Sequence, residues 1–509
     1  MCIMDLRIIP TAEACAKDLA TPCPARLMPP PLRASPRTAD RCASRIGPNI
    51  VARAGGFAYY SGSRQARQCR RAVLGNGKRV MRICRLLAVS LAMLVVSATP
   101  AIAEDWPQWR GPFFNGSTTE TGLPTDWSPT TNVAWVADLG GVGGSTPVIC
   151  GDDVFATAQH PGTKKLWALC LNRADGSLKW KHPMGVGFAN RMGNTGASPS
   201  PIADGRRAFF LFGTGELAAF DTDGKELWRR NIPKDHGKFE MLWDYGSTPL
   251  LYKGKLYLQV IHGAVRSKNP ADSYLLCIDP ATGKDLWKHI RPSDARSESR
   301  QAFTTPYPLE EGGRAAIVLV GGDCLTAHDL AGGKELWRSD TYNPSRGRLM
   351  RTVPSPVAAD GMVIACGPKH MAMHAVNGSL SGPAKRKWTW TIKDNSPDVC
   401  TPLVWGGRFY VLDGGKKVMT CIEPKTGKIL WKGDLGCKAK IETAPTGADG
   451  RIFFMSQAGE VVILEAGDAF KILKRIRMGG EKCQSAIAAA GGQLFIRTDT
   501  KLYCIGKRN

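Results

Sequence analysis

The chain has 509 residues, of which 43% are hydrophobic and 22% are charged, and it contains 56 glycines, 34 prolines and 16 cysteines. This is the composition of a globular protein, and it excludes collagen, a long coiled coil and wholesale disorder. The longest apolar run, residues 86–98, is shorter than the roughly 20 residues that a membrane-spanning helix needs, which excludes a polytopic membrane protein.

The net charge of +24 is unevenly distributed along the chain. Residues 1–80 hold 14 Lys and Arg against 4 Asp and Glu, whereas the chain from residue 104 onward holds 52 against 40. Much of the positive excess therefore lies outside the part that we expect to fold. Because no basic surface interleaved with aromatic side chains is visible, nucleic acid is not an expected partner.

Residues 81–103 have the three parts of a secretory signal peptide. A basic start over residues 81–85 precedes the apolar run, and Ala-Ile-Ala over residues 101–103 offers a cleavage site. We therefore expect a periplasmic or secreted protein, and we interpret residues 1–80 as an artefact of start-site assignment. The alternative is a real disordered extension with an internal anchor. No cysteine directly follows the apolar run to carry a lipid, so we expect at most peripheral contact with a membrane.

Residues 104–130 form an N-terminal segment, and a repeat dominates residues 131–509. The clearest copy, Cys-Ile-Asp-Pro-Ala-Thr-Gly-Lys-Asp-Leu-Trp over residues 277–287, combines an apolar strand end, a turn and a second strand that carries the tryptophan. Glycine supplies the positive φ of the turn, and the acidic side chain can accept hydrogen bonds from nearby backbone N–H groups. Further copies occupy residues 421–431, 327–337, 170–180 and 219–228, with degenerate copies at 375–388 or 375–390 and at 464–473.

A second pattern, Ser/Thr-x-Pro or a shortened form of it, begins a strand before each hairpin. It occurs eight times, starting at Ser145, Ser200, Ser247, Thr305, Ser355, Thr401, Thr443 and, without proline, Ser485. This period suits four short strands per unit, which is the pattern of a propeller blade. The unit at the C-terminus lacks its tryptophan strand, whereas residues 132–139, before the first unit, resemble such a strand without a hairpin.

These two observations predict an all-β fold in which the N-terminal strand completes the last blade and closes the ring, leaving no open sheet edge. The expected architecture is an eight-bladed β-propeller of four-stranded antiparallel blades. Seven blades is the alternative if a degenerate unit does not form.

The repeat resembles the tryptophan-docking motif of pyrroloquinoline-quinone (PQQ)-type propeller repeats, which occur in quinoprotein alcohol dehydrogenases and in the BamB family of outer-membrane assembly factors. The resemblance covers roughly residues 130–509, and residues 105–112 look like the head of exported propeller proteins of planctomycete-type bacteria. It implies that the repeated tryptophans pack between neighbouring blades in a structural role. These are Trp135, Trp180, Trp228, Trp287, Trp337 and Trp431.

A quinoprotein dehydrogenase would, by the same resemblance, need a catalytic aspartate, calcium ligands beside the quinone and often a disulfide between adjacent cysteines. The sequence has no adjacent cysteines and no CxxCH motif for haem, and the one close histidine pair, His370 and His374, is too widely spaced on a strand to share a metal. We therefore expect no metal and no cofactor. PQQ with calcium, in an oxidoreductase of alcohols or sugars, is the alternative.

The links between blades form the candidate binding surface. In this topology they emerge on one face around the central channel, and they carry charged side chains with a surplus of basic ones. The candidate residues are Arg191, Glu240, Asp244, Arg296, Arg300, Arg348, Arg351, Asp398 and Lys440. Such a surface suits an anionic or polar partner. The function that we expect is a monomeric, non-catalytic binding or scaffold module that presents this face to a protein or another component of the cell envelope.

Overall fold

The computed structural model describes residues 104–188, 194–340, 343–369 and 371–507. All of them belong to Val96–Asn509, one of the two compact units of the chain. The proposed signal peptide and the extension before it lie outside the described residues. Among the residues described, no helix is both long and apolar enough to cross a membrane.

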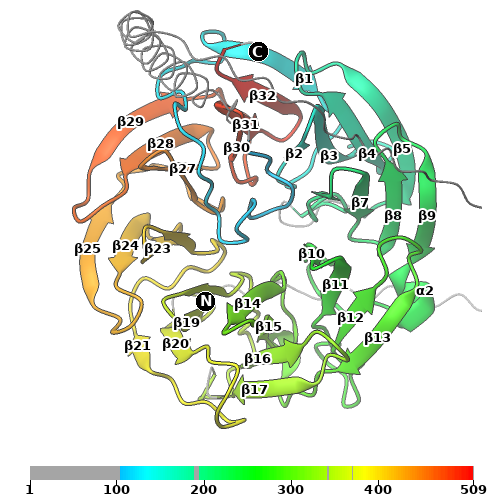
Figure 1. Cartoon of the computed structure of the whole chain (residues 1–509), viewed down its shortest axis with the longest axis vertical. Coiled ribbons are helices and arrows are strands. Elements are labelled where there is room, and N and C mark those ends of the chain that lie inside the picture. The colour runs from blue at the N-terminus through cyan, green and yellow to red at the C-terminus, as the bar shows by residue number, and fades with distance from the viewer. Residues whose placement is uncertain (1–103, 189–193, 341–342, 370, 508–509) are drawn as a thin grey trace, which may run out of the picture. The chain divides into compact units, whose positions relative to one another are not determined.

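The described chain forms eight four-stranded antiparallel sheets, which are the blades of a β-propeller (Figure 1). Blade 1 consists of β2 (Val148–Cys150), β3 (Asp153–Gln159), β4 (Lys165–Asn172) and β5 (Leu178–Val186). Blade 2 consists of β6 (Ile202–Ala203), β7 (Arg207–Leu211), β8 (Glu216–Asp221) and β9 (Glu226–Asn231). Blade 3 consists of β10 (Leu250–Tyr252), β11 (Lys255–Val260), β12 (Tyr274–Ile278) and β13 (Asp285–Ile290). Blade 4 consists of β14 (Tyr307–Glu311), β15 (Arg314–Gly321), β16 (Cys324–Asp329) and β17 (Glu335–Ser339).

The remaining blades repeat this order. Blade 5 consists of β18 (Val357–Ala359), β19 (Met362–Cys366), β20 (Met373–Asn377) and β21 (Trp390–Ile392). Blade 6 consists of β22 (Leu403–Trp405), β23 (Arg408–Asp413), β24 (Val418–Ile422) and β25 (Ile429–Asp434). Blade 7 consists of β26 (Thr446–Ala448), β27 (Arg451–Met455), β28 (Glu460–Glu465) and β29 (Ile472–Arg477). Between blades, the described chain also forms a short helix, α2 (Ile232–His236), and a 3-10 turn, η1 (Ser297–Arg300).

Blade 8 is built from both ends of the described chain. It combines β30 (Ala488–Ala490), β31 (Gln493–Arg497) and β32 (Lys501–Ile505) with β1 (Val133–Asp138), which pairs antiparallel with β32. Trp135 lies opposite Cys504, and Asp138 lies opposite Lys501. The predicted eight-bladed propeller, closed by its N-terminal strand, is therefore confirmed.

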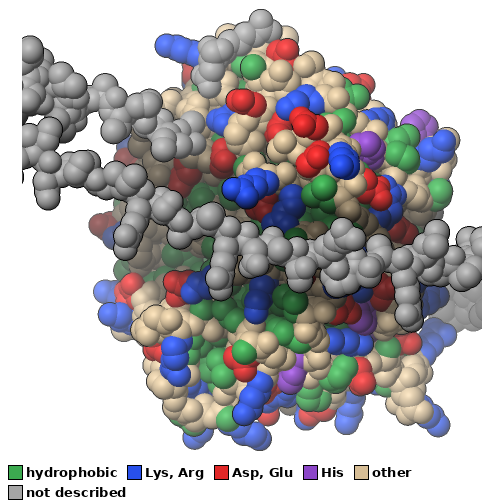
Figure 2. Space-filling view, turned by 45° about the vertical axis from the view of Figure 1, so that its right-hand side comes forward, with side chains coloured by type: hydrophobic (Ala, Val, Ile, Leu, Met, Phe, Trp, Pro, Cys, Tyr) green, Lys and Arg blue, Asp and Glu red, His purple; other side chains and the backbone are tan. Residues whose placement is uncertain are grey.

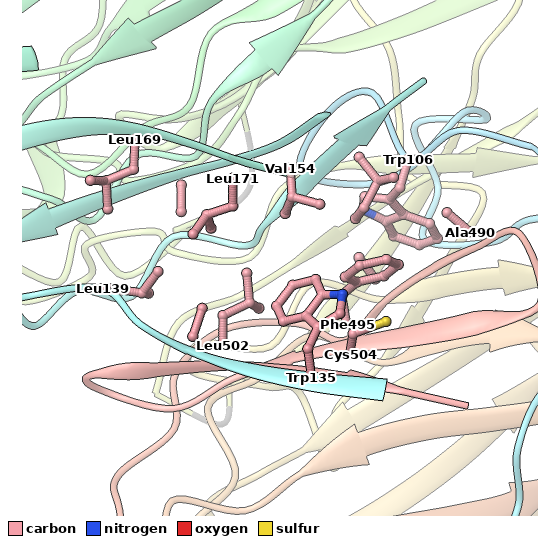
Figure 3. Close-up of a cluster of buried hydrophobic side chains, with 14 of the residues drawn as sticks. Trp106, Trp135, Leu139, Val154, Leu169, Leu171, Ala490, Phe495, Leu502 and Cys504 are labelled. Atoms are coloured by element: carbon pink, nitrogen blue, oxygen red, sulfur yellow. The ribbon is translucent and has the colours of Figure 1, made fainter. Parts of the chain in front are cut away.

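Hydrophobic clusters fill the space between neighbouring blades, because each sheet buries side chains on both faces. Figure 3 shows the cluster at the closure, where Trp135 of β1 and Phe495 of β31 pack beside Trp106 and Val154. The ring centroids of Trp135 and Phe495 are 6.0 Å apart. The closing strand thus contributes a large buried side chain as well as backbone hydrogen bonds.

Trp135 also shows how one blade is joined to the next. Its indole Nε1 donates to the carbonyl oxygen of Arg173, in the β4–β5 turn of blade 1, at 2.8 Å. Gly176 of the same turn has a φ of 74° and lies so close that an added Cβ would be 2.5 Å from the indole. The matching indoles that donate to a carbonyl of the next blade, at 2.8 to 3.0 Å, are those of Trp180, Trp228, Trp390 and Trp431.

In the strand pair that carries each docking tryptophan, the residue opposite the tryptophan is small. Cys504, Cys170, Cys277 and Cys421 lie opposite Trp135, Trp180, Trp287 and Trp431, whereas alanine lies opposite Trp228, Trp337 and Trp390. The four cysteines are fully buried, and the ten cysteines in the described part of the chain are all unpaired. They act here as small apolar side chains that leave room beside the indole.

Two of the docking tryptophans lack the hydrogen bond to a carbonyl oxygen of the next blade. The indole N–H groups of Trp287 and Trp337 have no hydrogen-bond partner among the described residues. Trp337 is 1% exposed, and the guanidinium of Arg386 lies 5.9 Å from its ring centroid. Arg386 belongs to the β20–β21 connection, whose backbone pairs with Arg338 of β17 in blade 4. In blade 5 the sequence left Trp388 and Trp390 as alternatives, and Trp390 occupies the docking position.

The Ser/Thr-x-Pro segments bind one another around the axis. The backbone N–H of Thr146 donates to Ser200 Oγ at 3.0 Å, that of Ser200 to Thr248 Oγ1 at 3.1 Å, and that of Ala486 to Thr146 Oγ1 at 3.2 Å. Thr305 and Ser355 donate in the same way to the segment that follows, at 2.8 and 2.9 Å. A belt of hydrogen bonds close to the axis therefore complements the tryptophan contacts at the periphery.

We predict that Gly176→Ala destabilises the propeller more than Gly254→Ala does. Both glycines have positive φ, 74° and 70°, but an added Cβ at Gly176 would overlap Trp135, whereas one at Gly254 would meet nothing within 4 Å. We expect a loss of about 1 kcal/mol for Gly254→Ala and about 2 to 4 kcal/mol for Gly176→Ala, measured by chemical denaturation. Equal losses would show that the turn does not pack against the tryptophan.

Candidate functional site

The strand order within each blade divides the connections between two faces of the ring. Neighbouring strands are antiparallel, so the turns between first and second strands and between third and fourth strands emerge on one face, which we call the turn face. The turns between second and third strands and the links from each blade to the next emerge on the opposite face, the link face. The predicted common face of the links follows from this topology.

A cavity of about 480 Å³ lies on the axis at the link face. Its wall contains polar residues of the belt, including Ser200, Thr248, Thr305 and Thr401, together with residues of the links. Links far apart in the chain thus meet at one recess. The charged side chains that line it are Asp244, Glu298, Arg351, Lys369, Asp398, Lys440 and Glu442.

Residues 104–118, which we call the head segment, cross the axis beneath this cavity. The backbone of Trp106 pairs with Ile149 of blade 1 through hydrogen bonds of 2.9 and 3.0 Å, and Thr118 N donates to Gly447 O of blade 7 at 3.1 Å. Figure 1 shows the beginning of the described chain, in blue, reaching the middle of the ring. Between the two attachments, Trp109 lines the axial cavity and also a cavity of about 20 Å³ beside Tyr307. Trp109 therefore lies between the two cavities, and we call it the floor of the larger one.

Arg110 holds the head segment in place. Its Nη1 donates to Pro445 O at 3.1 Å, and its Nη2 donates to Pro402 O and Asn115 O at 2.9 Å each. The side chain is buried and forms no ion pair with any residue that the structure describes. Burial lowers the pKa of Arg110 to about 9. The head segment is thus hydrogen-bonded, next to the inner strands of blades 6 and 7, through a buried cation that donates to carbonyl oxygens.

A charged network crosses one wall of the cavity. Nη1 and Nη2 of Arg351 lie 3.1 and 3.0 Å from the two carboxylate oxygens of Asp398, and its Nε lies 3.8 Å from Glu298 Oε1. Glu298, which is 6% exposed, also accepts a hydrogen bond of 2.9 Å from Trp243 Nε1 and lies 3.7 Å from Lys369 Nζ. Residues from three links and one turn are therefore held together by paired charges.

Across the cavity, Glu442 is held by amides. Gln484 Nε2 donates to its Oε2 at 3.0 Å, and the Gln457 side chain donates to the same oxygen. The nearby Lys440 has its carbonyl oxygen bonded to Gln457 N, but its ammonium group forms no ion pair with a described residue. Lys440 thus leaves a positive charge at this edge of the cavity.

The predicted face residues that the structure describes fall into three groups: four line the cavity, two are exposed outside it, and two make internal contacts. Asp244, Arg351, Asp398 and Lys440 line the cavity. Arg296 and Arg348 are exposed on the link face beyond the cavity wall, and neither pairs with an acidic side chain among the residues described. Arg191 lies outside the described residues.

Glu240 and Arg300 make internal contacts instead of facing a partner. A carboxylate oxygen of Glu240 accepts from the backbone N–H groups of Ala264 and Ala271, at 2.7 and 3.0 Å, which lowers its pKa. Arg300 Nη1 donates to the carbonyl oxygens of Ala264 and Ser267, at 2.8 and 2.9 Å. Both residues therefore hold the β11–β12 connection in position.

Glu298 and Glu442, which the sequence also placed among the charges of the links, line the cavity, whereas sequence reasoning missed Trp109, Trp243 and Lys369. Trp243 lies within a link that the sequence already placed on this face, so its position was available from the topology. Lys369 lies in the β19–β20 connection, and the alternation of strands would have placed that connection on the same face. No local signal in the sequence places Trp109, because its position depends on where the head segment crosses the ring.

The cavity does not fit a quinone with calcium. Calcium needs several oxygen ligands, but Glu298 and Asp398 are already bonded to Arg351 and lie beside Lys369, while Glu442 is bonded to two amides. Within the described residues there is no group of three or more metal-ligating side chains. PQQ is itself a polycarboxylate, and the four acidic side chains of the lining outnumber its three basic ones.

We predict that Arg110→Met releases the head segment. The substitution removes the Arg110 donor from Pro445 O and Pro402 O, whereas Asn115 O still accepts from Val404 N, and we expect a loss of about 3 kcal/mol together with faster cleavage of residues 104–118 by a nonspecific protease. Arg314→Met, at a surface arginine whose side chain is 57% exposed, is the matched control and should behave like the wild type. Cleavage that is unchanged in Arg110→Met would contradict the role of this buried cation.

Comparison with known proteins agrees with the fold. The sequence matches the family model described as "Outer membrane protein assembly factor BamB" over residues 117–266, 271–399 and 384–502. No curated protein matches the chain. Solved structures that resemble it include a europium-containing methanol dehydrogenase, with a TM-score of 0.57 and 10% identity, covering 78% of this chain and 90% of that one.

Two further solved structures, one of a dehydrogenase and one of BamB, resemble this chain. The quinohemoprotein alcohol dehydrogenase from Comamonas testosteroni has a TM-score of 0.55 and 11% identity, covering 80% of this chain and 81% of that one. BamB from Moraxella catarrhalis has a TM-score of 0.50 and 14% identity, covering 73% of this chain and 98% of that one. At these identities the likeness concerns the fold alone. Because the family model matches most of the sequence, the chain belongs to the BamB-like family of PQQ-repeat β-propellers.

Proposed function

We propose that this protein is an exported, non-catalytic binding module whose link face binds a macromolecular component of the cell envelope. The observation that carries this proposal is the axial cavity, a recess floored by Trp109 and walled by side chains from several links. A recess whose charged groups are already fixed by ion pairs and hydrogen bonds is suited to recognising a ligand. Export rests on the signal-like pattern of residues 81–103.

The surface around the cavity supports contact with a partner larger than the recess. Leu242, on the link between blades 2 and 3, is 41% exposed, and Leu349, on the link between blades 4 and 5, is 57% exposed. Arg348 is an exposed cation next to Leu349 in the chain, and Arg296 is an exposed cation on the link between blades 3 and 4. Figure 2 shows that positive and negative side chains are interspersed on the side of the molecule that it presents. The surface outside the recess thus carries exposed apolar and charged side chains, and we propose that these contact the partner.

The family description adds a second support. The matching model is named for an outer membrane protein assembly factor, and BamB from Moraxella catarrhalis shares the fold. A role in the cell envelope for this chain is a proposal drawn from that name. The second candidate, a PQQ- and calcium-dependent oxidoreductase, draws on the likeness to the methanol dehydrogenase, but the paired carboxylates of the cavity argue against it.

Site-specific photocrosslinking in the native host tests the proposal. A photoreactive residue in place of Leu349 should form a discrete adduct with an envelope component, because this side chain is 57% exposed on the link face. The same residue in place of Leu286, which is 49% exposed on the outer strand β13, is the matched control and should form none. Absence of an adduct at position 349, or equal adducts at both positions, would contradict the proposal.

Incubation of the purified protein with PQQ and calcium separates the two candidate functions. We expect no saturable change in quinone absorbance and no reduction of an artificial electron acceptor by alcohols or sugars. Saturable binding with turnover would support the oxidoreductase and overturn the non-catalytic proposal.

A further inference from the structure

The charges that line the axial cavity nearly cancel, with one acidic side chain in excess. Four acidic side chains face three basic ones, and the central pair, Arg351 and Asp398, is joined by two hydrogen bonds of 3.1 and 3.0 Å. An anionic ligand would meet more negative than positive charge, and a cationic ligand would meet carboxylates that already have partners. The lining therefore offers fixed hydrogen-bond donors and acceptors without a strong net charge.

Aromatic surfaces complete the recess. Trp109 forms the floor and Trp243 contributes to the wall, and both are partly exposed. Trp243 is held at both ends, since its indole donates to Glu298 and its carbonyl oxygen accepts from Asn194 Nδ2 at 3.2 Å. Two hydrogen bonds thus hold Trp243 in position without a ligand, which lowers the entropic cost of ordering it on binding.

The polar groups surround the aromatic floor on several sides. Lys440, Glu442 and Gln484 line the cavity along with the Arg351–Asp398 pair. Their side chains come from four links, so donors and acceptors lie on several sides of the recess. The volume of about 480 Å³ lies within the range of about 300 to 1,000 Å³ that is usual for small-ligand sites.

We propose that the axial cavity binds a neutral, polyhydroxylated ring, such as a hexose unit. An apolar ring face would pack on Trp109, and each hydroxyl group, which both donates and accepts, would match the mixed lining better than a charged group would. The proposal rests on the proposed binding function and names its ligand class: the envelope component would present a neutral glycan. No bond is made or broken in this step.

Titration of the intact protein, followed by tryptophan fluorescence and calorimetry, tests the ligand class. The probes are glucose and N-acetylglucosamine, the neutral tetrasaccharides of each, and a tetramer of galacturonic acid. We expect saturable binding of at least one neutral probe and no binding of the acidic tetramer. Tighter binding of a tetrasaccharide than of its monomer would indicate a glycan, and equal binding would indicate a free sugar. If no neutral probe binds, or if the acidic tetramer binds best, the inference is overturned.

Variants of the lining test the position of the site. Trp109→Ala should weaken binding of the best neutral probe at least about tenfold, and Trp109→Phe should restore most of it because a ring face remains. Gln484→Leu provides an independent variant that leaves the head segment intact and should also weaken binding. Lys425→Met, on the turn face, is the control and should bind like the wild type. Equal binding by all four variants would place the saccharide elsewhere and contradict the inference.

The outcomes separate this inference from the function on which it rests. An adduct at position 349 without any saccharide binding would overturn the glycan inference and leave the binding module in place. Loss of both the adduct and the saccharide binding would overturn both.

Discussion

The pairing of β1 with β32 is the interaction on which the rest of the structure depends. It supplies the fourth strand of blade 8, removes the open edge that three strands would leave, and places Trp135 against the turn of blade 1. Because the strand order is the same in every blade, all links emerge on one face and all hairpin turns that meet the tryptophans emerge on the other, and closure arranges them in a ring. The axial cavity exists because these links converge on a common axis.

Closure also determines where the head segment runs. The chain that precedes β1 is attached to blade 1 through Trp106 and to blade 7 through Thr118, on either side of blade 8, which contains β1. Between these points the segment crosses the axis and reaches Tyr252 of blade 3 through Phe114, and the Arg110 guanidinium donates to the carbonyl oxygens of Pro402 and Pro445. The same crossing changes a channel into a recess with an aromatic floor. The binding function that we propose depends on this conversion.

The sequence predicted the repeated architecture well and the site only in part. Hairpins, docking tryptophans and ring closure follow from local patterns that recur at a regular spacing. Trp390 was ambiguous because Trp388 lies two residues away and would point to the same side of a strand. The links were correctly assigned to one face, but their composition does not reveal that Arg351 faces the axis whereas Arg300 bonds to neighbouring carbonyl groups. The position of Trp109 depends on contacts with residues some 300 positions later, which no local pattern encodes.

A disulfide across the closure tests the central claim most directly. Asp138 and Lys501 lie opposite each other and are both exposed, and the Cα separation of an antiparallel pair suits a disulfide. In the variant Asp138→Cys/Lys501→Cys, we expect an intramolecular disulfide to form in the folded, oxidised protein and to raise its melting temperature, with Asp138→Cys alone as the control. If both new thiols remain free and reactive in the folded double variant, β1 does not close the ring.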